Sequence, residues 1–133
     1  MMKNVFIAED DEQMRKLYFQ AFNYAGFEVE MASDGEETLK KLLEIKVKPN
    51  IIFLDIMMPK KNGFEVMEIL FNDVAYEKNK DVPVVVLTNF ESLDGGEADL
   101  EKARSLGAID VIIKSKTDPT DIIKKAEEII NRK

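Results

Sequence analysis

The chain has 133 residues, of which 45% are hydrophobic and 34% are charged, as is typical of one globular domain large enough to bury a core. The net charge of −7 is unfavourable for direct binding to nucleic acid. The chain contains no cysteine and no histidine, which excludes disulfides, thiolate metal sites and acid–base catalysis by histidine.

The first half of the chain begins with a short apolar strand, predicted over residues 5–8, that runs directly into four acidic residues. A helix follows, with apolar residues at helical spacing from Met14 to Ala25, and Gly26 ends it. Residues 27–31 alternate between apolar and polar, as expected for a strand with one polar face. The next helix starts at Ser33 or Asp34 and must end before Pro49.

The second half of the chain contains three more apolar segments. Residues 51–54, 84–87 and 108–113 lack alternation, so we predict strands that are buried on both faces. Helices are predicted over residues 64–74, 98–106 and 119–130, with Asp118 as the cap of the last one. The polar segments 77–81 and 89–96 are predicted loops.

These five strand–helix units alternate strictly, which predicts an α/β fold with a parallel sheet covered by helices on both faces. Right-handed crossovers leave few topologies, and we predict the doubly wound five-stranded order 2-1-3-4-5. The second strand is the least apolar, so it is placed at an edge. Residues 1–133 are expected to form a single domain.

Polar residues stand at the carboxyl ends of four predicted strands: Glu9 and Asp10, then Asp55, Thr88 and Lys114. In a parallel sheet these ends share one rim, and the first and third strands flank the switch point where such sheets bind ligands. Each residue has an ordinary explanation, as a turn residue, a helix-start acid, a strand residue or a surface lysine. Their joint occurrence predicts one polar pocket.

The residue types in this pocket indicate its chemistry. Three close carboxylates raise one another's pKa unless a cation is present. Oxygen ligands of this kind suit Mg²⁺, which readily shares its coordination sphere with a phosphate. A carboxylate can act as a nucleophile and form an aspartyl phosphate, whose oxygens Mg²⁺ and Lys114 would neutralise.

Four motifs, VFIAEDD, LDIMMPKKNG, VVVLTN and GAIDVIIKS, occur in this order over nearly the whole chain. With them the chain resembles the receiver domain of two-component response regulators, of the stand-alone, chemotaxis-regulator-like type. The resemblance implies a flavodoxin-like (βα)5 fold and a cytoplasmic signalling protein rather than an enzyme. It would take a phosphoryl group from the phosphohistidine of a histidine kinase or phosphotransfer protein, and would signal to a downstream protein target.

The resemblance also assigns roles to the acidic residues. It implies that Asp55 is the phosphoacceptor of a Mg²⁺-dependent reaction. Asp10, Asp55 and the backbone carbonyl of Met57 would bind Mg²⁺ directly, and Glu9 would act through water.

Further roles concern the phosphoryl group and the response to it. By the resemblance, Thr88 contacts the phosphoryl group and moves on activation, while Lys114 pairs with the phosphoryl oxygens. Val111 stands where the family usually has an aromatic residue, so a backbone or loop shift is the expected readout. Met57 and Phe90 border the path of the attacking water, and their bulk predicts slow loss of the phosphoryl group.

Three other functions are alternatives to this one. A haloacid-dehalogenase-type Mg²⁺ phosphohydrolase would need a second acid where this chain has Met57. A nucleotide-binding module would need a glycine-rich phosphate loop, which the sequence lacks. A receiver-like interaction module that is never phosphorylated would differ by gaining no mass with acetyl phosphate and Mg²⁺.

The partners expected from the sequence are proteins alone. The N-terminus becomes acidic too early for a signal peptide, and no apolar run approaches membrane-spanning length. We therefore expect no membrane partner, and the net charge argues against a nucleic-acid partner. The oligomeric state is left open, with a monomer favoured. Whether the chain stands alone or was cut from a longer regulator is left open.

Overall fold

The computed structural model describes residues 2–89 and 97–132. Its centre is a parallel sheet of order β2-β1-β3-β4-β5. The strands are β1 (Asn4–Ala8), β2 (Glu28–Ala32), β3 (Ile51–Asp55), β4 (Val84–Thr88) and β5 (Asp110–Ile113). The predicted doubly wound fold is confirmed, including the edge position of β2.

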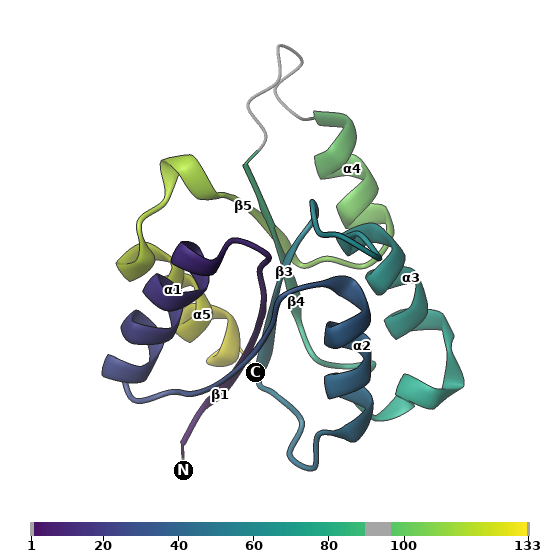
Figure 1. Ribbon diagram of the computed structural model, residues 1–133, viewed down its shortest axis with the longest axis horizontal. Helices are drawn as coiled ribbons and strands as arrows, with labels where there is room; N and C mark the ends of the chain where they lie inside the picture. Colours follow the sequence, from purple (N-terminus) through teal and green to yellow (C-terminus); the bar gives the residue numbers. More distant parts are fainter. Residues whose placement is uncertain (1, 90–96, 133) are drawn as a thin grey trace.

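Helices cover both faces of this sheet (Figure 1). One face carries α1 (Glu12–Tyr24) and α5 (Pro119–Ile130), and the other carries α2 (Gly35–Glu44), α3 (Gly63–Asn72) and α4 (Glu97–Ser105). Two short 3₁₀ helices are η1 (Val74–Asn79) and η2 (Lys114–Lys116). Within residues 2–89 and 97–132, no helix has the length and apolar character needed to cross a membrane.

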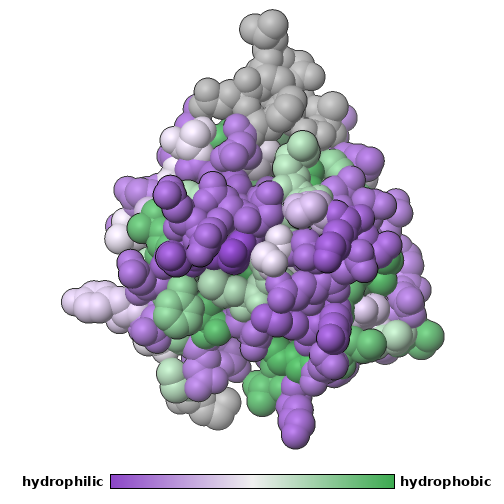
Figure 2. Space-filling model, viewed as in Figure 1, coloured by the Kyte–Doolittle hydropathy of each residue, from purple (hydrophilic) through white to green (hydrophobic). Residues whose placement is uncertain are grey.

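Two apolar cores lie on the two faces of the sheet, because successive strand residues point to opposite sides. Ile7 and Phe53 face α1 and α5, whereas their neighbours Ala8 and Leu54 face α2 and α3. The α1/α5 core consists of Val5, Ile7, Tyr18, Phe22, Phe27, Ile51, Phe53, Val85, Leu87, Ile112, Ile122, Ala126 and Ile129. Hydrophilic residues cover most of the molecular face seen in Figure 2, with apolar residues in small, separated groups.

The predicted loop over residues 77–81 is partly wrong, because residues 77–79 belong to η1. Two buried side chains fix this segment to α2: the Tyr76 hydroxyl donates to the Leu39 carbonyl at 3.0 Å, and the Asn79 amide donates to the Leu42 carbonyl at 3.1 Å. The helix predicted over residues 64–74 ends at Asn72. Val74, expected on its inward face, is 80% exposed.

The fifth strand is shorter and less buried than predicted. It begins at Asp110 rather than Ala108, because the Ala108 N–H closes the end of α4 by donating to the Ala103 carbonyl at 3.0 Å. Gly107 makes this turn possible with a φ of +115°. β5 is an edge strand with a neighbouring strand, β4, on one side only. Val111 is therefore only partly buried.

Candidate functional site

Among the residues that the structure describes, the buried charged side chains gather at the carboxyl end of the sheet. Glu9 follows β1, Asp55 ends β3 and Lys114 follows β5. By the alternation of the strands, all three lie on the face that carries the α1/α5 core. Their exposed fractions are 0%, 2% and 8%. Charges this deeply buried are tolerated only when they are paired.

Lys114 supplies that pairing for both acids. Its Nζ lies 2.7 Å from Glu9 Oε1 and 3.0 Å from Asp55 Oδ2. The remaining carboxylate oxygens accept backbone hydrogen bonds: Glu9 Oε2 from the Asp11 N–H and Asp55 Oδ1 from the Met57 N–H, each at 3.1 Å. One ammonium group therefore joins the ends of β1, β3 and β5.

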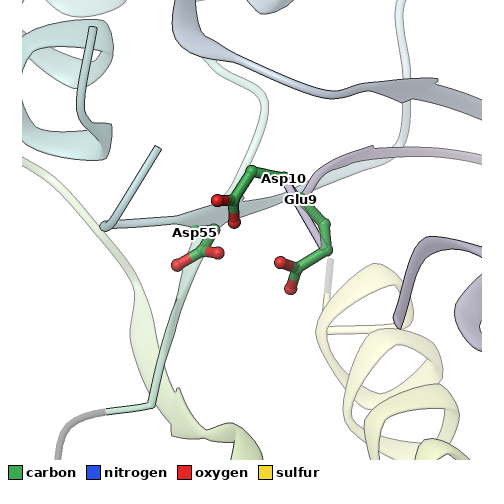
Figure 3. Close-up of side chains that lie close together, drawn as sticks. All are labelled: Glu9, Asp10 and Asp55. Carbon is green, nitrogen blue, oxygen red and sulfur yellow. The ribbon is translucent and has the colours of Figure 1, made fainter. Parts of the chain in front are cut away.

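Asp10 adds a third carboxylate to this group from the exposed rim. Glu9, Asp10 and Asp55 each place one carboxylate oxygen in the same small region. These three oxygens lie within 4.8 Å of one another. Figure 3 shows these side chains converging from the ends of β1 and β3. Oxygen donors at this spacing, carrying more negative charge than Lys114 neutralises, fit a magnesium ion.

Two further residues, Arg15 and Gly63, which the sequence pattern did not single out, hold the backbone around the acids in place. Arg15 Nη1 donates to the carbonyls of Glu9 and Asp10, at 2.9 Å each, and so fixes the turn between β1 and α1. Gly63 packs so closely that an added Cβ would lie 2.6 Å from the Asp55 carbonyl oxygen. The Arg15 contacts join the first turns of α1 to the segment just before it, and the Gly63 contact depends on how the start of α3 packs against the end of β3. The apolar periodicity of the sequence carries no signal for either.

The other predicted site residues are Thr88, Met57, Val111 and Phe90. Thr88 ends β4 and is buried between the neighbouring strands β3 and β5, and its contact with a phosphoryl group stays a prediction. Met57 is 70% exposed, so its part in limiting water access stays a prediction. Val111 packs on the α2 and α3 side of the sheet, opposite the acids. Phe90 lies outside the described residues.

The surroundings affect the ionisation of Asp55 and Lys114 differently. Burial, followed by the charge of Glu9, raises the pKa of Asp55 to about 7 despite the opposing effect of Lys114. Burial alone would lower the pKa of Lys114, but its bonds to Glu9 and Asp55 raise it. Lys114 therefore remains charged at neutral pH, while Asp55 needs additional positive charge to be fully ionised.

This shift predicts an unusual dependence of stability on pH. The pKa of Asp55 is about 7 in the folded protein against an ordinary value of 3.8 for an aspartate side chain, so folding binds a proton between these values. Without divalent cations, the free energy of unfolding should fall as pH rises from about 4 to about 7, by at most about 4 kcal/mol. Urea unfolding of wild type and Asp55→Asn in EDTA measures this.

The Asp55→Asn variant is expected to show a flatter profile over the same interval. Acids whose pKa is lowered in the fold, such as Glu37 and Asp110, lose their stabilising effect as pH falls below their unfolded pKa values of 4.5 and 3.8. They are present in both proteins, so the difference between the two profiles reports Asp55. Parallel profiles for the two proteins would contradict the burial argument.

Comparison with known proteins gives a consistent family. The profile of the response regulator receiver domain matches residues 5–127. The chain is 32% identical over 130 residues to the probable transcriptional regulator ycf27 of Guillardia theta, covering 98% of this chain and 46% of the relative. It is 30% identical over 131 residues to the transcriptional regulatory protein CpxR of Escherichia coli K12, covering 98% and 50%.

Solved structures agree with the fold. The chemotaxis response regulator CheY4 of Vibrio cholerae matches with a TM-score of 0.81 and 26% identity, covering 97% of this chain and 99% of that one. The similarity to CheY4 thus extends over both chains almost completely, whereas this chain spans about half the length of the two curated relatives.

Proposed function

The chain belongs to the response regulator receiver domain family of two-component systems, and on that premise we propose that it accepts a phosphoryl group on Asp55 and signals through protein contacts. Phosphorylation and Mg²⁺ dependence are general properties of receiver domains. The proposal for this chain is specific: Asp55 is the nucleophile, Asp10 and Glu9 serve the metal, and Lys114 serves the phosphoryl group.

One observation carries this proposal. Asp55 is a buried carboxylate held 3.0 Å from a charged lysine, and it shares a cluster with Glu9 and the exposed Asp10. A structural salt bridge would need one acid for one lysine, and the extra carboxylates make the resting site less stable. Three carboxylates around one lysine are unfavourable unless a further cation is bound. This arrangement therefore supports a role of the site in binding a metal cation.

The residues present would divide the reaction among them. Asp10, Asp55 and the Met57 carbonyl would hold Mg²⁺, with Glu9 behind them, and the ion would supply positive charge to the phosphoryl oxygens and to Asp55. A carboxylate oxygen of Asp55 forms the new O–P bond as the P–N bond of a phosphohistidine breaks and the imidazole leaves. Lys114 offers its ammonium group to the phosphoryl oxygens, and Thr88 lies at the neighbouring strand end.

The proposed partners follow from this chemistry. The sequence contains no histidine, so the phosphohistidine belongs to a kinase or phosphotransfer protein. A net charge of −7 favours a protein as the downstream target of this domain over nucleic acid. The activities of the longer curated relatives remain a separate matter, since this chain spans only half of them.

Removing the charge of Asp10 tests the metal site. We expect Mg²⁺ to raise the melting temperature of the wild type by several degrees, because it binds only the folded protein. Acetyl phosphate should add one phosphoryl group only when Mg²⁺ is present. Asp10→Asn is expected to lose the Mg²⁺ shift and most of the labelling, as measured by thermal melts and intact mass.

Glu12→Gln is the matched control, because Glu12 is an exposed acid two residues away, paired only loosely with Lys16 at 3.5 Å. It removes the same charge from the start of α1 and should behave like the wild type. An equal loss in both variants would indicate a general charge effect. An unchanged Mg²⁺ shift in Asp10→Asn would place the ion elsewhere.

A further inference from the structure

Tyr18 is a buried polar residue that the proposed chemistry does not use. It lies in α1 and packs in the α1/α5 core with an exposed fraction of 1%. Its hydroxyl has no hydrogen-bond partner among the residues that the structure describes. Buried hydroxyls are almost always bonded, and an unbonded one destabilises the fold. Tyr76 shows the usual arrangement, because its buried hydroxyl donates to the Leu39 carbonyl at 3.0 Å.

The position of Tyr18 relates its hydroxyl to the charged site. The α1/α5 core contains Tyr18 and lies on the same face of the sheet as Glu9, Asp55 and Lys114. Its strand residues Ile7 and Phe53 stand two positions before Glu9 and Asp55 on that face. Burial raises the pKa of Tyr18, and the charges of Glu9 and Asp55 raise it further, in that order. The hydroxyl is thus neutral, carries its proton and lies within electrostatic reach of both carboxylates.

Glu9 is the acid whose bonding must change when the site is used. In the structure its Oε1 accepts from Lys114 at 2.7 Å and its Oε2 from the Asp11 N–H at 3.1 Å. A phosphoryl group on Asp55 adds oxygens that attract the same ammonium group. As Lys114 turns to them, Glu9 loses its charged donor while it remains fully buried, which is costly unless another donor replaces it. The Mg²⁺-bound water that Glu9 would serve and any hydroxyl group nearby are then the donors left to it.

We propose that Tyr18 is a positioning residue for phosphorylation, whose hydroxyl donates a hydrogen bond to Glu9, directly or across one water molecule, when Lys114 moves to the phosphoryl group. The inference rests on the proposed function. The hydroxyl then has no acceptor in the resting protein, which it destabilises. It gains an acceptor in the phosphorylated protein, which it stabilises. No proton is transferred in this exchange.

The test compares Tyr18→Phe with the wild type in the resting state and with beryllofluoride, a mimic of the phosphoryl group, at saturating Mg²⁺. Removing an unbonded hydroxyl should leave the resting melting temperature unchanged or raise it. The affinity for beryllofluoride should fall about tenfold, the usual effect of losing one hydrogen bond to a charged group. If Tyr18 served packing alone, its substitution would not lower the affinity for beryllofluoride while leaving the resting melting temperature unchanged or higher.

Tyr76→Phe is the matched control, because it removes a hydroxyl that is bonded on the opposite side of the sheet. It should lower the resting melting temperature and leave the affinity for beryllofluoride unchanged. Tyrosine absorption gives an independent reading, since the chain has three tyrosines and no tryptophan. Beryllofluoride should produce a near-ultraviolet difference spectrum in the wild type and Tyr76→Phe that is absent in Tyr18→Phe.

The outcomes distinguish this inference from the function on which it rests. Equal affinities of Tyr18→Phe and the wild type, or a difference spectrum that persists in Tyr18→Phe, would overturn the role of Tyr18 alone. A resting melting temperature that falls as far as in Tyr76→Phe would do the same, because the hydroxyl would already be bonded. A wild type that does not bind beryllofluoride would overturn the proposed function itself.

Discussion

Asparagine in place of Asp55 is expected to abolish phosphorylation while the fold is retained. Wild-type protein treated with acetyl phosphate and Mg²⁺ should gain the mass of one phosphoryl group, and Asp55→Asn should gain none. The reason is chemical: the carboxylate oxygen is the nucleophile, and an amide oxygen of the same shape is a far weaker one. Intact-mass spectrometry measures the label, and peptide mapping places it.

The same substitution is expected to stabilise the resting protein. It removes one of the two buried carboxylates that share Lys114, and Glu9 keeps its 2.7 Å contact with that ammonium group. Loss of label thus comes with a higher melting temperature in EDTA, so unfolding cannot explain it. Asp81→Asn is the control, because Asp81 is an exposed acid that pairs with Lys48 far from the site. Undiminished labelling of Asp55→Asn would move the phosphoacceptor to another residue.

The sequence predicted the parts of the molecule that depend on local patterns. Unalternating apolar runs identified β3 and β4, and strict alternation of elements led to the observed strand order. The position of a polar residue after each run then placed Glu9, Asp55 and Lys114 at one rim. These inferences succeeded because strand direction and pleat determine where each strand end lies.

Contacts between distant side chains could not be predicted in this way. The resemblance implied that Lys114 pairs with the phosphoryl group, but its bond to Glu9 joins residues 105 positions apart in the chain, which no local pattern predicts. Tyr18 appeared only as one apolar position of a helix. The polar hydroxyl of a tyrosine at a core-facing helix position was the one signal that pointed to a special role for Tyr18. η1 escaped prediction because hydrogen bonds to α2, rather than its own polar sequence, hold it in place.

Methionine in place of Lys114 is expected to lower the free energy of unfolding by about 3–5 kcal/mol in the absence of Mg²⁺. Methionine approximates the length of the lysine stem but carries no charge. The substitution leaves Glu9 and Asp55 buried side by side without their shared ammonium group. This is a large part of the stability of a typical domain, and urea unfolding measures it.

Two treatments should restore part of this loss. Mg²⁺ should stabilise Lys114→Met more than the wild type, because the ion then meets a more negative site. Adding Glu9→Gln to Lys114→Met removes one of the uncompensated charges, so the double variant should be more stable than Lys114→Met alone. The interaction between the two substitutions in this cycle gives the coupling of the Glu9–Lys114 pair.

Lys125→Met provides the comparison that isolates burial. Lys125 lies 2.9 Å from Asp110, which is nearly the distance between Lys114 and Asp55, but its side chain is 35% exposed. Water screens such a pair, so its loss should cost less than about 1 kcal/mol. If both lysine variants lost a similar, small amount of stability, Lys114 would not be compensating the buried acids. A loss several times larger for Lys114→Met would show that the resting fold depends on the ammonium group that phosphorylation is proposed to redirect.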